Sequence, residues 1–194
     1  MKIVIITNCS KRKKQKAQQS LMAMNLQAAS IEHVANEWSQ EVMASKGDTL
    51  VAREQYVGRS FKEVKIIEKA VEFDWHIISA GLGLISSEKG IPSYDLTITN
   101  GSSNSIVQKL SSNSSIADWW AKINEKFNHE CFPIAKLLNN NKDSLFLFAL
   151  TKSYFNLISS EFSKINDKSK IRLFGFRDSN NLVESIKKYF LPYD

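Results

Sequence analysis

Hydrophobic residues fall into four short runs along the chain, each of which is typical of a buried strand. The runs are residues 2–7, 75–80, 145–150 and 171–174. They are rich in β-branched and aromatic residues and alternate little with polar ones, which favours strands covered on both faces, as in a parallel sheet. The pattern therefore predicts four strands.

Between the strands the apolar positions recur every three or four residues, the spacing of an amphipathic helix. The longest such stretch, residues 15–44, predicts one long or once-broken helix that ends before Gly47. Shorter helices are predicted over residues 61–71, 115–127, 131–138, 154–162 and 180–190. Alternating strands and helices predict an α/β fold with a central, mostly parallel four-stranded sheet flanked by helices.

The length and the apolar pattern also bear on domain number and compartment. A chain of 194 residues has the size of one domain, so a single α/β domain over residues 1–194 is expected. The apolar run at residues 3–6 is too short for a signal or a membrane span, which predicts a cytoplasmic protein with no membrane partner. Cys9 and Cys131 are then expected to be free thiols.

Positive charge is concentrated after the first predicted strand. The chain has 26 lysines and arginines against 20 acidic residues, a net charge of +6. Part of the excess lies at Lys11, Arg12, Lys13, Lys14 and Lys16. Such a balance favours a polyanionic partner, with a solvated lysine-rich surface as the alternative.

Ligands of open α/β sheets bind at the carboxyl ends of the strands. The segments that follow the predicted strands are residues 8–11, 79–95, 151–154 and 175–178. Residues 81–105 are long for a structureless connection, which points to a functional loop.

Several common catalytic motifs are incomplete. A phosphatase loop C-x5-R starting at Cys9 would need arginine where the chain has Gln15. The Gly81-Leu82-Gly83 turn lacks the third glycine of a dinucleotide fingerprint, and His129 with Cys131 lacks the C-x-x-C of a zinc deaminase. The sequence therefore predicts neither a metal nor another cofactor.

Three motifs remain, and they lie near the predicted strand ends. They are N-C-S-K-R-K at residues 8–13, Y-V-G-R-S-F at 56–61, and I-S-A-G-L-G-L-I at 78–85, which continues to I-P-S-Y-D-L-T at 91–97. In this order they resemble a family of small prokaryotic proteins, a domain of unknown function related to the uracil-DNA glycosylase superfamily and to YaaA-like proteins. That family has C-S-x-x-K, Y-x-G-x-x-F, and S-A-x-x-G-L leading to P-Y-D, whereas here Ser93 separates Pro92 from Tyr94.

The resemblance spans nearly the whole chain and implies a uracil-DNA glycosylase-like sheet. Residues 15–46 are longer than the corresponding gap in the family, so they are expected to form a helical insertion. Relatives include DNA glycosylases that act against phage with modified bases, which implies that DNA is the partner and that an N-glycosidic bond is hydrolysed. YaaA-like relatives bind DNA, so a non-catalytic DNA-binding module is one alternative. A hydrolase or transferase of free nucleotides or nucleosides is another.

The candidate site residues follow from this chemistry. Cleavage of an N-glycosidic bond passes through an oxocarbenium-like sugar, which a carboxylate stabilises. Asp95 is the candidate carboxylate, or else caps a turn, and Asn8 orients water or reads a base, or else forms a turn. Candidates for contact with an extruded base or its sugar, or else for the core, are Tyr94, Tyr56, Ser79 and Cys9. Candidates for phosphate contacts are Ser10, Lys11, Arg12, Lys13, Lys14, Arg59 and Lys152.

Overall fold

A five-stranded sheet forms the centre of the computed structural model, which describes residues 1–45, 47–175 and 184–191. The strand order is β4-β3-β1-β6-β7. The strands are β1 (Lys2–Asn8), β3 (Asp74–Ser79), β4 (Gly83–Ser86), β6 (Ser144–Ala149) and β7 (Ile171–Phe174). All neighbours are parallel except β3 and β4. The predicted α/β fold with a mostly parallel sheet is therefore confirmed, although the sheet has five strands and not four.

The strand that the sequence did not reveal is β4. Only residues 80–82 separate it from β3, so the two form a tight antiparallel hairpin at the sheet edge, with Ile77 paired to Ile85. The strand lies inside the stretch 81–105 that was interpreted as a loop. The same stretch also contributes β5 (Gly90–Ile91), which pairs with β2 (Leu50–Val51) in a separate two-stranded sheet.

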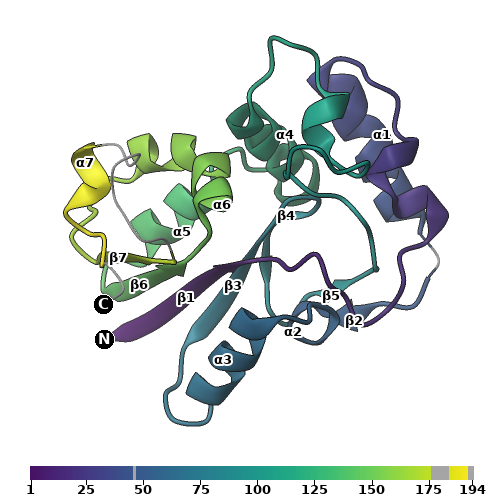
Figure 1. Cartoon of the computed structure of the whole chain (residues 1–194). Helices are drawn as coiled ribbons and strands as arrows, with labels where there is room; N and C mark the ends of the chain where they lie inside the picture. The colour runs from purple at the N-terminus through teal and green to yellow at the C-terminus, as the bar shows by residue number, and fades with distance from the viewer. Residues whose placement is uncertain (46, 176–183, 192–194) are drawn as a thin grey trace.

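Helices cover both faces of the large sheet. The connection from β1 to β3 and the one from β6 to β7 run in opposite directions along the sheet. Because such crossovers are right-handed, helices that cover the sheet in these two connections are expected on opposite faces. Figure 1 shows α3 on one side, and α4, α5 and α6 on the other. The helices are α1 (Ile31–Ala44), α2 (Ala52–Gln55), α3 (Arg59–Ile67), α4 (Ile116–Asn128), α5 (Pro133–Asn140), α6 (Lys152–Leu157) and α7 (Glu184–Lys187).

The predicted helix over residues 15–44 is wrong in its first half. The helix starts at Ile31, after Ser30, whose side chain accepts a hydrogen bond from the backbone N–H of His33. Residues 15–30 instead run extended, with two short 3₁₀ turns at Gln19–Leu21 and Ala23–Asn25. Their backbone pairs with distant segments, so tertiary contacts override the helical spacing of the apolar residues. The segment 15–46 is therefore not a helical insertion as a whole.

The C-terminal part agrees with the prediction where it is described. Strand β7 has the predicted bounds, and α7 lies within the predicted helix 180–190. Residues 180–183 of that prediction, and 176–178 of the segment after β7, lie outside the described residues.

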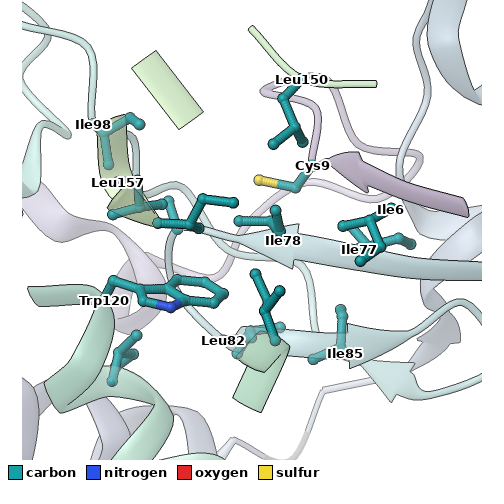
Figure 2. Packing of buried hydrophobic residues seen from close by; sticks show 14 of the residues in the cluster. Ile6, Cys9, Ile77, Ile78, Leu82, Ile85, Ile98, Trp120, Leu150 and Leu157 are labelled. Atoms are coloured by element: carbon teal, nitrogen blue, oxygen red, sulfur yellow. The ribbon is translucent and has the colours of Figure 1, made fainter. Parts of the chain in front are cut away.

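The hydrophobic core includes residues of α3 as well as of α4 and α6, so it covers both faces of the sheet. Figure 2 shows Ile78 of β3 in this cluster with Trp120 of α4 and Cys9. Two buried indoles hold the turn that follows β3: Trp119 of α4 donates to the Ala80 carbonyl at 2.8 Å, and Trp38 of α1 donates to the Gly81 carbonyl at 2.7 Å. The carboxyl end of β3 is thereby fixed against two helices.

Candidate functional site

A cleft of about 200 Å³ opens at the carboxyl ends of β1 and β6, where the fold predicts a ligand site. One wall comes from the loop after β5, and the other from the ends of the two strands and the start of α6. The lining residues are Asn8, Cys9, Ser10, Lys11, Leu96, Thr97, Ile98, Thr99, Thr151, Ser153 and Tyr154. Four predicted site residues thus meet in one cleft: Asn8, Cys9, Ser10 and Lys11.

Asn8 ties the ends of two neighbouring strands together. Its Oδ1 accepts a hydrogen bond from the backbone N–H of Thr151 at 3.1 Å, and its Nδ2 donates to the carbonyl of Cys9 at 3.0 Å. An amide oxygen has two lone pairs, so Oδ1 can accept a further bond from a ligand or a water. Asn8 therefore shapes the cleft and retains one acceptor position.

The thiol of Cys9 is largely buried at the base of the cleft. Its sulfur lies 3.0 Å from the hydroxyl of Tyr154, a residue of α6. Burial, with the charge of Cys9 second, raises the pKa of Tyr154 well above its usual value. The Tyr154 hydroxyl therefore stays protonated and is a hydrogen-bond donor at neutral pH.

Tyr56, Ser79 and Tyr94 meet through their hydroxyls in the interior. The Tyr94 hydroxyl lies 2.6 Å from Ser79 Oγ and 2.7 Å from the Tyr56 hydroxyl. All three side chains are at most 1% exposed. Burial raises the pKa of both tyrosines, so the three groups form a neutral hydroxyl cluster.

The buried rings correct the expected role of these residues in base contact. Tyr94 packs edge-on against Trp38 at 6.0 Å, and Tyr56 packs against Phe61 at 5.4 Å. Gly81 permits this approach, because a Cβ there would lie 3.0 Å from the Tyr94 ring. In this structure neither ring is open to an extruded base. Tyr56, Ser79 and Tyr94 are therefore core residues.

Lys13 lies on these rings instead of reaching into solvent. Its Nζ is 4.1 Å from the centre of the Tyr94 ring and 5.6 Å from that of Tyr56. Burial lowers the pKa of Lys13, while the negative charges of Cys9 and Asp95 act in the opposite direction. Lys13 is therefore not a solvated lysine of the kind that was expected to contact phosphate.

Asp95 is held close to the cleft but does not line it. Its Oδ2 accepts a hydrogen bond from Asn104 Nδ2 at 2.9 Å. Its backbone pairs with the extended segment before α1, with bonds of 2.8 Å to Leu21 and to Ala23. The side chain is half-buried, and the next residue, Leu96, is the first of the cleft wall.

The remaining cations differ in how far they are engaged. Lys11, Arg12, Lys14 and Lys152 are exposed and form no ion pair with the described residues. Arg59 forms an ion pair with Glu63 at 2.7 Å. Ser10 donates to the carbonyl of Val57 at 2.9 Å, so its hydroxyl proton is engaged. Of these four cations without an ion pair, Lys11 lines the cleft, Arg12 and Lys14 follow it in the chain, and Lys152 lies between the cleft residues Thr151 and Ser153 in the sequence.

Sequence reasoning missed much of the cleft wall. Thr97 ends the last motif and Thr99 lies two residues beyond it, and Thr151, Ser153 and Tyr154 lie in the segment after the third predicted strand. Their position after a strand was the one signal in the sequence that could have indicated a role in the site. None of these residue types is distinctive enough to mark a site.

Nowhere in residues 1–45, 47–175 or 184–191 do three or more histidine, cysteine or acidic side chains gather to hold a metal ion. No helix within those ranges is long and apolar enough to cross a membrane. The sequence matches no protein-family model and no curated protein.

Proposed function

We propose that this protein binds DNA and hydrolyses the N-glycosidic bond of a base that it receives in the cleft at the ends of β1 and β6. The resemblance to relatives of the uracil-DNA glycosylase superfamily supports this reaction. It also supports modified bases of phage DNA as the substrates, and hence a role in antiviral defence.

The observation that carries the proposal is a small cleft of neutral hydrogen-bonding groups beside free cations. A volume of about 200 Å³ is below the range of drug-sized pockets and suits a ligand as small as a single base. Hydroxyls and amides in its wall can bond the edge of a base, which is how enzymes read an extruded nucleotide. Lys11, Arg12 and Lys14 on one side and Lys152 on the other can hold the flanking phosphates.

Asn8 and Asp95 have different roles in the proposed reaction. Asn8 directs the free acceptor of Oδ1 at the attacking water, in the cleft. Asp95 supplies the negative charge that stabilises the cationic sugar. No residue that lines the cleft is an aspartate or glutamate, and Asp95 adjoins its wall. We therefore assign the stabilisation of the cationic sugar to Asp95.

The experiment is incubation of the protein with unmodified DNA and with base-modified phage DNA. Released base is detected by mass spectrometry, and abasic sites by strand scission in alkali. We expect release from modified DNA, loss of release in Asn8→Ala and Asp95→Asn with DNA affinity retained, and normal release in Asp143→Asn, a control at the amino end of β6. Release only from free nucleosides would overturn the proposal, as would full activity of Asp95→Asn.

A DNA-binding module without chemistry is the second candidate, and the position of Asp95 favours it. The carboxylate is bonded to Asn104 and does not line the cleft, as expected for a residue that stabilises a loop. In that case DNA binding is salt-sensitive and no base is released from any DNA tested. The same incubation therefore separates the two candidates.

A further inference from the structure

A second hollow lies at the amino ends of β6 and β7, at the end of the sheet opposite to the cleft. It is a cavity of about 90 Å³. Its inner wall is formed by three buried side chains, Leu138 of α5, Phe146 of β6 and Ile171 of β7. Phe146 and Ile171 are register partners in neighbouring parallel strands, so their side chains lie side by side on one face of the sheet. The inner part of the cavity is therefore apolar.

One polar group of the cavity wall is buried without a partner. Ser144 is 4% exposed, and its hydroxyl forms no hydrogen bond with the described residues. It lies two residues before Phe146 in β6, so the two side chains point to the same face of the sheet, and both line the cavity. Buried hydroxyls are normally hydrogen-bonded. The Ser144 hydroxyl is therefore available to a molecule in the cavity.

The exposed part of the lining is positively charged. Lys142 is exposed and forms no ion pair with the described residues, and Lys170 is paired with Asp143 at a distance of 3.6 Å. Asp167 also lines the cavity, but both of its carboxylate oxygens accept hydrogen bonds from Ser169. The lining thus presents two ammonium groups against one carboxylate that is already bonded, which favours an anion.

The size and the apolar wall restrict what this anion can be. A cavity of about 150 Å³ with an apolar lining holds a benzene molecule, so about 90 Å³ suits a chain of roughly three or four carbon atoms. Such a chain buries apolar surface against the inner wall, which inorganic phosphate cannot do. A carboxylate at one end of the chain accepts charge-assisted hydrogen bonds, which are stronger than those between neutral groups.

We propose that this cavity is a binding site for a short-chain monocarboxylate. The carboxylate accepts hydrogen bonds from the hydroxyl of Ser144 and from the ammonium groups of Lys142 and Lys170, and the aliphatic chain lies against the apolar inner wall. None of the residues that line this cavity lines the cleft at the ends of β1 and β6. The inference therefore does not depend on the proposed hydrolysis of DNA.

The test uses sodium butyrate as the probe and follows the backbone amides of the whole chain by two-dimensional NMR at constant ionic strength. Butanol and butylamine are the matched ligands, because they keep the aliphatic chain and replace the carboxylate with a neutral or a cationic group. The variants are Ser144→Ala, which removes the buried hydroxyl, and Lys142→Gln, which removes one positive charge. Ser153→Ala, in the cleft, is the control. Circular dichroism and a thermal melt confirm that each variant is folded.

We expect butyrate to shift the amides of Ser144, Phe146 and Ile171 until they saturate, while butanol and butylamine leave them in place. Ser144→Ala should weaken the affinity for butyrate by about tenfold or more, the worth of one hydrogen bond to a charged group. Lys142→Gln should weaken it as well, and Ser153→Ala should leave it unchanged. No saturable shift with butyrate, equal binding of butanol, or native affinity in Ser144→Ala would each overturn the inference.

Discussion

The hydroxyl of Tyr154 lies 3.0 Å from the sulfur of Cys9, although 145 positions separate the two residues. The contact joins the end of β1 to the first turns of α6 across the base of the cleft. Among the described residues, it is the one hydrogen bond between a side chain of the C-terminal half and the motif at residues 8–13. The stability of the cleft therefore depends on both halves of the chain.

Replacing Tyr154 with phenylalanine tests this contact. We expect the free energy of unfolding to fall by about 0.5–1.5 kcal/mol, the net worth of one hydrogen bond. Urea denaturation measures the change. Ser153→Ala is the control, because Ser153 lies in the same wall, is exposed, and its hydroxyl forms no hydrogen bond with the described residues. An equal loss in both variants would show that the contact itself contributes nothing.

The buried hydroxyl cluster gives a larger effect. Tyr94→Phe removes the bonds of 2.6 Å to Ser79 and 2.7 Å to Tyr56 and leaves these two hydroxyls with their mutual bond of 3.3 Å. At about 0.5–1.5 kcal/mol for each hydrogen bond, the two lost bonds are worth about 1–3 kcal/mol. We expect a loss of that size in urea denaturation. The double variant Tyr56→Phe with Tyr94→Phe should lose less than the sum of the single losses, because the residues share their hydrogen bonds. Additive losses would contradict a shared network.

Glu161 makes the stability of the protein depend on pH. Its side chain is fully buried and accepts N–H bonds from Trp120 at 2.8 Å and Ala135 at 2.9 Å. Burial is the main cause that raises its pKa from 4.5 to about 7, and the charge of Glu130 adds to the rise. Between these two pH values the folded protein holds a proton that the unfolded chain has released. Its stabilising contribution is thus full below pH 4.5 and is lost as the pH rises to about 7.

The size of this loss is about 3 kcal/mol, from about 1.4 kcal/mol for each pKa unit. Denaturation of the native protein and of Glu161→Gln across this range measures it as the difference between the two. His76 acts in the opposite sense. Burial lowers its pKa, so the folded protein loses stability as the pH falls through 6.5. His76 is present in both proteins and cancels in the difference. A difference that does not change with pH would contradict the assignment to Glu161.

The cations beside the cleft predict how DNA binding responds to salt. Each phosphate contact adds about 0.9 to the slope of log K against log salt. We expect Arg12→Gln and Lys14→Gln each to reduce the slope by about 1, the worth of one phosphate contact. Lys142→Gln, just before β6 at the other end of the sheet, should leave it unchanged. Fluorescence anisotropy of a labelled duplex over a salt series provides the slopes, and equal slopes for all four proteins would exclude this surface.

The sequence predicted the fold best where local pattern and burial agree. The runs that became β1, β3, β6 and β7 are covered on both faces, so their composition alone marks them. Strand β4 has two glycines close by and follows β3 after three residues, which made it look like a loop. Leu21 has helical spacing to Met24, yet it ends a 3₁₀ turn and is buried, and its carbonyl accepts a hydrogen bond from the backbone N–H of Asp95. A local pattern cannot reveal such a distant partner.

For the candidate site, the sequence predicted the end of the sheet at which the cleft opens, but not the orientation of the side chains there. Asn8 and Lys11 lie in the cleft, as their place after β1 suggests. Tyr56 and Tyr94 do lie together, but their hydroxyls satisfy each other and Ser79, which makes deep burial favourable. Whether a polar aromatic residue faces a ligand or a neighbour depends on such pairing, which spacing does not encode.

The extended segment between β1 and α1 has a consequence for how the chain folds. It is held by single-residue bridges, Lys13 with Tyr56, Met22 with Asp95 and Ala29 with Leu110. Each bridge closes a long loop of chain and gains little backbone pairing in return, so none can form early. We therefore expect the segment to dock late in folding, after the central sheet has formed. Its amide protons are then expected to exchange with solvent before those of the central strands.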